Sequence, residues 1–332
     1  MRKHMLPICY LSVLVLFLLD TTTMQQGVRD GIELCLITVI PALFPFLLLS
    51  SPLMEQLRNS SIPLSSGISR LLRISQNSVP LFLIGLLGGY PVGARCIAQD
   101  VKTGKLSPAD GNRMLCFCTN AGPSFIFGMG ISLFADGMIC CLAWMIQILS
   151  AVLMGIMTPG SCKLQRVSNS KDTSATTDTL FKAMETMGMI CGWVVIFRII
   201  ICYCKQYLFR FVPQMVGDIL LGLLELSNGC YSLQEMADLQ TSWLLFSLYL
   251  ALGGGCVALQ TASILRTVHL SVASYLRAKF CQGILALSLA GALCPYPIAG
   301  RWIWLLPIGA LICGRIFILP KISTGKRERV GV

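Results

Sequence analysis

Arg95 stands one helical turn beyond a break in an apolar run, and that position suits the binding of a carboxylate. The break is the Gly-Gly-Tyr-Pro sequence at residues 88–91, and the interrupted run begins at Val79. A helix that restarts after a break presents unpaired N–H groups and about half a positive charge at its N-terminus. A guanidinium one turn later can clamp a carboxylate through two parallel hydrogen bonds. The alternatives are that Arg95 extends to the membrane surface or pairs with Asp100.

The other residues of this break fit the same role. Gly89 and Gly93 allow a ligand to come close to the backbone, and Pro91 suits the first turn of a helix. Tyr90 could stack on an aromatic ring of a ligand, although packing is the more common role of such a tyrosine.

A second apolar run is broken at residues 119–123, Thr-Asn-Ala-Gly-Pro. Asn120 and Ser124 flank this break and could donate to a substrate or to backbone groups that the break frees. The runs around both breaks are shorter than the roughly 20 apolar residues that one spanning helix needs. Paired, interrupted apolar segments of this kind indicate the binding site of a membrane transporter.

The composition indicates an integral membrane protein. Mean hydropathy is +0.73, 55% of the residues are hydrophobic and 12% are charged, whereas soluble domains have about 25% charged residues. The 332 residues allow roughly eight to ten membrane segments. The net charge of +11 is spread over loops beside apolar runs, as expected for basic residues held on the cytoplasmic face, so we expect no nucleic-acid partner.

Metal, cofactor and catalytic chemistry are not expected. The 16 cysteines lie mostly in apolar runs, where they act as small hydrophobic residues, and none forms a C-x-x-C pair. His4 and His269 are the only histidines, which argues against a zinc site and a Ser-His-Asp triad. We find no phosphate loop or nucleophile elbow either, so we predict that the protein is not an enzyme and carries no cofactor.

Several further segments are predicted to lie in or on the membrane. The run 5–19 is interpreted as an uncleaved span rather than a signal peptide, and residues 31–53 as a span kinked by Pro41 and Pro45. The arginine-containing segment 54–78 is expected to lie along the membrane surface. The other predicted spans are 138–157, 180–204, 243–265, which is broken at the three glycines 253–255, 280–293 and 302–319.

In the second half, the segment 219–229 ends in polar residues and glycine and is predicted to be a half-helix. Glu225 and Asn228 in it could bind a coupling cation or a proton. The alternative is that Glu225 is a hydrogen-bonded structural carboxylate.

An internal repeat is suggested by the similarity of LGGYPV at residues 87–92 to LGGGCV at residues 252–257. In this alignment Gln260 takes the place of Arg95, with Thr261 and Ser263 beside it. Internal duplication of broken segments is common in secondary transporters. The basic C-terminus favours a cytoplasmic end, whereas a strictly inverted repeat could place the basic link 266–279 outside, and the sequence leaves this conflict open.

The repeat sets the predicted domain organisation. Residues 1–30 form an N-terminal span and loop, and the two repeats cover residues 31–158 and 182–320. A polar cytoplasmic linker at 159–181 joins them, and a basic tail occupies residues 321–332.

The chain resembles the YlbJ-type sporulation integral membrane proteins of the wider nucleoside-recognition or Gate-domain membrane family, which is related to concentrative nucleoside transporters. Six sequences carry the resemblance: VIPALFPF (39–46), GGYPVGAR (88–95), G-x-L-S-x-x-x-x-x-R (104–113), FCTNAGPSFIFG (117–128), LLELSNG (223–229) and LGGGCVALQTASIL (252–265). The resemblance covers roughly residues 30 to 290.

The resemblance implies an all-α, polytopic membrane protein made of two repeated halves with broken or re-entrant helices. It implies a transporter of a small organic anion, dipicolinate entering the developing spore, in the bacterial cell membrane or the outer forespore membrane. A carrier of nucleosides or other neutral solutes, and a non-transporting scaffold needed for sporulation, are the alternatives.

These considerations define the predicted site and partners. The predicted substrate-binding residues are Gly89, Tyr90, Pro91, Gly93, Arg95, Asn120, Ser124, Gln260, Thr261 and Ser263, and the predicted coupling-ion or structural polar residues are Glu225 and Asn228. The expected partners are the lipid bilayer and a small anionic substrate, and homo-oligomer formation is left open.

Overall fold

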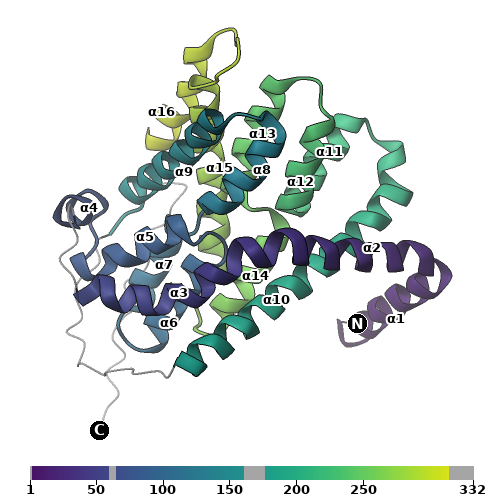
Figure 1. Cartoon of the computed structure of the whole chain (residues 1–332), viewed down its shortest axis with the longest axis horizontal. Helices are drawn as coiled ribbons and strands as arrows, with labels where there is room; N and C mark the ends of the chain where they lie inside the picture. The colour runs from purple at the N-terminus through teal and green to yellow at the C-terminus, as the bar shows by residue number, and fades with distance from the viewer. Residues whose placement is uncertain (1, 60–64, 161–175, 314–332) are drawn as a thin grey trace.

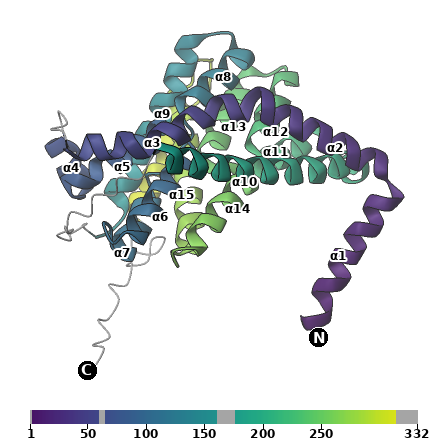
Figure 2. The same ribbon diagram turned by 60° about the horizontal axis from the view of Figure 1, so that its bottom comes forward.

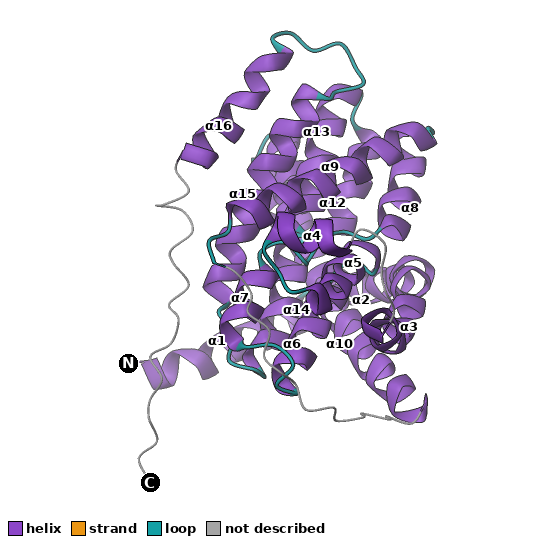
Figure 3. Ribbon diagram, turned by 90° about the vertical axis from the view of Figure 1, so that its left-hand side faces the viewer, coloured by secondary structure: helices purple, strands orange, loops and turns teal. Residues whose placement is uncertain are grey.

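The computed structural model describes residues 2–59, 65–160 and 176–313, and all regular elements in these ranges are helical (Figures 1 and 3). The prediction of an all-α protein is therefore confirmed for this part of the chain. The predicted linker 159–181 falls mostly outside the described residues, and the basic tail 321–332 falls wholly outside them.

The described residues of the first half, 2–59 and 65–160, contain nine α-helices and two short helical turns of other types. They are α1 (Arg2–Leu19), α2 (Thr21–Leu34), η1 (Cys35–Val39), α3 (Ile40–Asn59), α4 (Ser65–Leu72), η2 (Gln76–Ser78), α5 (Val79–Leu87), α6 (Val92–Lys102), α7 (Pro108–Leu115), α8 (Pro123–Phe134) and α9 (Gly137–Met157).

The second half is described from residue 176 onward. Its elements are α10 (Thr176–Tyr203), η3 (Cys204–Leu208), η4 (Phe209–Phe211), α11 (Gln214–Leu224), α12 (Leu226–Ser232), η5 (Leu233–Glu235), α13 (Leu239–Leu252), α14 (Gly254–Arg266), α15 (Val272–Ala292), η6 (Arg301–Leu305) and α16 (Leu306–Cys313).

Within the described part of the chain, four helical stretches are long and apolar enough to cross a membrane: Thr21–Ser50, Gly137–Met157, Thr179–Phe211 and Leu239–Arg266. Five shorter apolar helices are Tyr10–Leu19, Gln76–Leu87, Pro123–Phe134, Gln214–Leu224 and Arg301–Leu311. The roughly eight to ten membrane segments that the sequence allows therefore include short helices that turn back or break, as well as long ones. The apolar part of the predicted first span is among the short ones, and α1 turns away from the other helices (Figure 2).

The predicted kink near Pro41 takes the form of a change in helix type. α2 passes into the π-helical turn η1 and then directly into α3, so the chain stays helical from Thr21 to Asn59. Pro41 lacks the N–H that would complete the preceding α-helical turn, and a π-helical turn is a usual way to absorb such a missing bond.

Each half follows the same order of parts. A long helical stretch comes first (α2–α3 or α10), then a hairpin of two short helices (α5–α6 or α11–α12). A broken helix follows (α7–α8 or α13–α14), and a 21-residue helix ends the unit (α9 or α15). We call these parts the first and second hairpins and the first and second broken helices. All four breaks that were predicted from the sequence occur in the structure.

The first hairpin closes around the backbone of the first broken helix. Gly85 and Gly93 face each other across the hairpin, and the Cys118 carbonyl lies against both glycines. A Cβ atom at either position would stand 2.0 Å from that oxygen. At the tip, Gly89 (φ +74°) crosses Gly122 backbone to backbone. Glycine is therefore required here so that two interrupted chain segments can pass each other.

The second hairpin repeats this packing with its own glycines. Gly222 and Gly229 meet across it, and the Tyr249 ring of the second broken helix covers Gly222. Gly254, which begins α14, lies against the Gly222 carbonyl and the Glu225 N–H. Each hairpin tip therefore contacts the break of the broken helix in its own half.

The two broken helices run in opposite directions. At one end of the helix bundle, the Asn112 side chain near the start of α7 accepts a hydrogen bond from Ser271 N (2.7 Å), in the link before α15. At the other end, Gln234 in the link before α13 donates to Ser132 Oγ (3.1 Å), near the end of α8. Figure 3 shows α7 and α14 toward one end, and α8 and α13 toward the other.

This arrangement differs from the repeat register that the sequence suggested. Residues 88–91 form the tip of a hairpin, whereas residues 252–257 span the bend of a broken helix. The sequence alignment therefore pairs two different structural parts. The basic links 102–107 and 266–271 lie at the same end of the bundle, whereas the basic C-terminal tail lies outside the described residues.

We expect Gly85→Ala to prevent correct folding, because the new methyl group would overlap the Cys118 carbonyl, and backbone on both sides cannot yield cheaply. Gly128→Ala in α8 is the matched control, because no atom lies within 4 Å of the place that its new methyl group would take and alanine favours a helix by about 1 kcal/mol. Size-exclusion chromatography in detergent measures the monodisperse fraction. Equal fractions for both variants would contradict the described packing of the hairpin.

Candidate functional site

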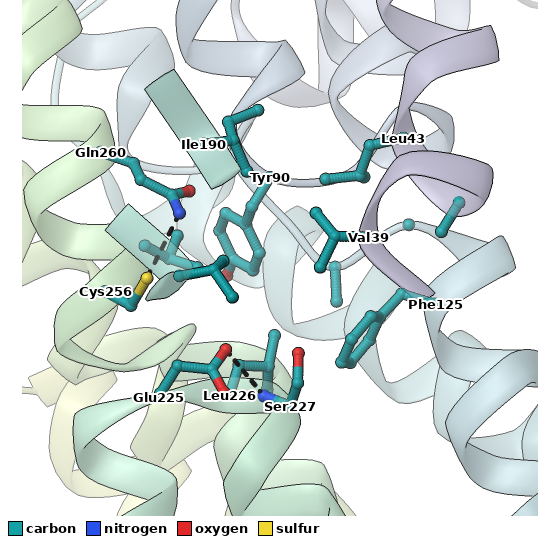
Figure 4. A pocket seen from close by; sticks show the side chains of 15 residues that line it. Val39, Leu43, Tyr90, Phe125, Ile190, Glu225, Leu226, Ser227, Cys256 and Gln260 are labelled. Atoms are coloured by element: carbon teal, nitrogen blue, oxygen red, sulfur yellow. Dashed lines mark hydrogen bonds between the residues drawn. The ribbon is translucent and has the colours of Figure 1, made fainter. Parts of the chain in front are cut away.

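A cavity lies where the two hairpins and the two broken helices meet (Figure 4). It holds about 520 Å³ of empty space, its open mouth included, which is in the range of small-molecule sites. Its walls come from both halves of the chain and are mostly apolar. The lining residues are Val39, Ala42, Leu43, Tyr90, Ala121, Gly122, Phe125, Ile190, Val194, Glu225, Leu226, Ser227, Cys256, Val257 and Gln260.

All four breaks contribute to this cavity. Tyr90 comes from the tip of the first hairpin, and Gly122 from the unwound part of the first broken helix. Glu225 comes from the tip of the second hairpin, and Cys256 from the first turn of α14. The long helices α3 and α10 close the sides with apolar residues such as Leu43 and Ile190. Of the residues that the sequence analysis assigned to one site at these breaks, Tyr90, Glu225 and Gln260 line the cavity.

Tyr90 joins the first hairpin to the second broken helix. Its hydroxyl donates to the carbonyls of Ala251 (2.9 Å) and Leu250 (3.3 Å), in the last turn of α13. These carbonyls have no partner within their own helix because α13 ends at Leu252. Tyr90 is buried, and its ring forms part of the cavity wall. The tyrosine therefore satisfies backbone groups that the second break leaves open.

Glu225 caps the second half of its hairpin. Its carboxylate accepts hydrogen bonds from Ser227 N (3.0 Å), Asn228 N (2.7 Å) and Asn228 Nδ2 (2.7 Å). The residue is buried and lines the cavity beside Ser227 (Figure 4). The sequence left two roles open for Glu225, binding of a coupling cation or proton and a structural role as a hydrogen-bonded carboxylate. The three hydrogen bonds fit the structural role.

Gln260 is the cavity-lining member of the predicted group in α14. Its amide nitrogen lies 3.3 Å from Cys256 Sγ, a weak acceptor, so the amide has capacity for a stronger partner. Thr261 and Ser263 are not among the lining residues. Ser263 Oγ donates to the Gln260 carbonyl (2.7 Å), and Thr261 is fully buried.

Arg95 lies in the first turn of α6, as predicted, with its N–H bonded to the Pro91 carbonyl (3.0 Å). The alternative that Arg95 pairs with Asp100 is wrong, because Asp100 forms an ion pair with Arg58. Arg95 Nη1 is buried without a hydrogen-bond partner among the described residues. Arg95 is not one of the cavity-lining residues.

The other predicted residues of the first half mostly serve the chain itself. The Cys118 carbonyl occupies the space beside Gly93, and the Gly122 backbone occupies the space beside Gly89. Pro91 precedes the first residue of α6. The exposed Ser124 side chain donates to the Ala42 carbonyl (3.2 Å).

Asn120 is fully buried and belongs to a polar network that the sequence analysis missed. Its amide nitrogen donates to the Phe117 carbonyl (2.9 Å), and its oxygen accepts from Gln282 Nε2 (2.6 Å). Gln282 in turn accepts from Lys279 Nζ (2.6 Å). The sequence signal for this network was weak, because Lys279 follows the exposed Arg277 in the same helix.

The fold and the cavity define an integral membrane protein with interrupted helices around a central site. Large apolar side chains such as Ile37 (67% exposed), Phe181 (65%) and Phe280 (64%) lie on the outside of the described helices, as expected for surfaces in contact with lipid. No group of three or more His, Cys, Asp or Glu residues that could hold a metal occurs in the described ranges.

The chain is similar to the sporulation integral membrane protein YlbJ of Bacillus subtilis strain 168. The two sequences are 20% identical over 306 residues, which cover 79% of this chain and 75% of that protein. No protein-family model matches the chain, and no solved structure matches it. This chain is thus an integral membrane protein related to a sporulation membrane protein.

We expect Tyr90→Phe to lower the free energy of unfolding by about 1–3 kcal/mol, because two buried carbonyls of α13 would lose their donor. Tyr231→Phe is the control, because Tyr231 is 64% exposed, and its change should stay within about 0.5 kcal/mol. Unfolding in mixed micelles measures both. A Tyr90→Phe protein as stable as the control would show that the hydroxyl does not hold the second break.

Proposed function

We propose that this protein is a membrane carrier for a small organic solute and that the cavity at the four breaks is its binding site. The observation that carries the proposal is that one cavity is lined by both hairpin tips and by both broken helices. Carriers bind their substrates between repeats at discontinuous helices, because irregular backbone is tolerated at membrane depth where it is enclosed in protein or borders a cavity.

The arrangement of the two halves supports this proposal. Each half contains a hairpin and a broken helix in the same order, and the two broken helices run in opposite directions. An inverted structural repeat of this kind is common in secondary transporters. The resemblance of the sequence to the YlbJ-type proteins, whose wider family is related to the concentrative nucleoside transporters, agrees with such an organisation. We propose this transporter-like fold in place of the register suggested by the glycine sequences.

Charge at the two ends suggests an orientation. Lys102, Lys105 and Arg266 lie at the end where α7 starts, and Asp136 and Glu235 lie at the end where α8 finishes. Because cytoplasmic loops carry an excess of lysine and arginine, we place the basic end in the cytoplasm.

The cavity wall favours a neutral solute with a flat, hydrogen-bonding ring system. Most of the wall is apolar, Tyr90 offers an aromatic surface, and Gln260 and Ser227 offer polar groups. Glu225 is the acidic residue of the wall, and a carboxylate disfavours the approach of an anion. A nucleoside fits this set of contacts, since amides read the edges of bases and tyrosine stacks on them.

An organic anion such as dipicolinate is the second candidate, and Arg95 favours it. Its guanidinium is partly buried, with Nη1 unpartnered among the described residues, one turn beyond the tip of the first hairpin. A carboxylate would supply that missing partner if the tip moved to admit it. A scaffold without transport activity is the remaining alternative, and we propose no enzymatic activity.

The first test is uptake of labelled uridine and labelled dipicolinate into proteoliposomes that contain the purified protein. We expect Gln260→Leu to lower uptake of the transported solute about 10-fold or more, because the loss of one buried hydrogen bond in a polar site costs about 1–3 kcal/mol. Gln99→Leu in α6 is the control, since Gln99 is exposed and does not line the cavity. Equal uptake by both variants would place the binding site elsewhere, and no uptake of either solute by the wild type would favour the scaffold.

Arg95→Gln separates the two candidate solutes. If the substrate is an organic anion, this variant should lose dipicolinate uptake while the protein still accumulates in the membrane, because the proposed counter-charge is gone. If the substrate is neutral, uridine uptake should remain within about twofold of the wild type. Dipicolinate uptake that survives Arg95→Gln would exclude this arginine as the anion-binding group.

A further inference from the structure

Lys279 lies inside the protein beside the unwound backbone of the first broken helix. The residue is 3% exposed, and Nζ donates to the Thr119 carbonyl (2.7 Å) and to Gln282 Oε1 (2.6 Å). Nζ also lies 4.9 Å from the centre of the Tyr90 ring. No carboxylate pairs with it among the described residues. The ammonium is therefore held by two oxygens and an aromatic face, which together form a cation-binding environment.

The oxygens around this ammonium are fixed in orientation by a chain of hydrogen bonds. Gln282 Nε2 donates to Asn120 Oδ1 (2.6 Å) and to Ser150 Oγ (3.3 Å), so the amide oxygen of Gln282 faces Lys279. Asn120 keeps its own oxygen available because its nitrogen donates to the Phe117 carbonyl. These hydrogen bonds hold the Gln282 amide with its oxygen toward the positive charge.

The corresponding contact, between α9 and the second broken helix, contains no charged side chain. Counted from the first residue of each helix, Gln147 in α9 holds the place of Gln282 in α15. Gln147 Nε2 donates to the Ser247 carbonyl of the second broken helix (3.2 Å). The place of Lys279 is taken by Trp144. Because this second contact forms without a cation, packing of the helices alone does not explain Lys279.

We propose that the Thr119 carbonyl, Gln282 Oε1 and the Tyr90 ring form a monovalent-cation site that the Lys279 ammonium occupies. Carriers hold their coupling cations at unwound backbone carbonyls of this kind. In this protein the side chain of Lys279 supplies the cation. Glu225, the other candidate for a cation site, already accepts three N–H groups. Transport then needs no free sodium ion, a consequence that rests on the proposed carrier function, whereas the site itself does not.

The test replaces the tethered cation with a free one. In Lys279→Ala the side chain is removed and the oxygens remain, so sodium should bind there and stabilise the protein. The full-length protein is purified in detergent, and its Tm is measured in sodium chloride and in choline chloride at equal ionic strength. We expect Lys279→Ala to unfold about 3 °C or more higher in sodium. The wild type and Arg95→Ala, which removes a partly buried charge elsewhere instead, should show equal Tm values in the two salts.

Equal Tm values of Lys279→Ala in sodium and choline would overturn the proposal, and so would the same sodium effect in all three proteins. Lys279→Met serves if Lys279→Ala does not fold, because it retains most of the volume and removes the charge. It should unfold at a lower temperature than the wild type, and a Tm equal to or above the wild-type value would also overturn the proposal. Because no solute is used, this result is independent of the uptake experiments.

Discussion

The structure depends on how backbone groups are satisfied where helices stop inside an apolar environment. Each break frees N–H and carbonyl groups that lipid cannot bind, so the protein must supply partners. Tyr90 serves the last turn of α13, Lys279 serves the Thr119 carbonyl, and Glu225 serves the start of α12. The side chains that close one break come mostly from another element. The four breaks therefore hold one another in place around the cavity.

Much of the fold could be predicted from the sequence because breaks have a clear local signal. Glycine and proline within short apolar runs indicated the interruptions at residues 88–91 and 119–123, and the apolar composition indicated a membrane protein. The relation between the halves was not predictable in the same way. Which break is a hairpin tip and which is a bend depends on close packing, such as Gly85 and Gly93 against the Cys118 carbonyl, and two similar glycine sequences can serve either purpose.

The candidate site was predicted only in part for the same reason. Tyr90, Gln260 and Glu225 line the cavity, whereas Gly93 and Ser124 contact the chain's own backbone. Residue type and proximity to a break indicate that a group must be satisfied, but not whether a ligand or the protein satisfies it. Lys279 was missed for the opposite reason, because its sequence context resembles that of a surface residue. It follows a basic link and precedes an apolar run, so only its burial in the structure reveals that it belongs to the interior.

Lys279 also has a consequence for the balance between the two open forms of a carrier. In a protein made of two opposed halves, exchange of the roles of the halves converts the form open to one side into the form open to the other. Identical halves would make these forms equal in energy. For the carrier proposed above, α15 carries a charge where α9 carries the indole of Trp144, so the two forms are expected to differ in energy and the resting carrier to favour one side of the membrane.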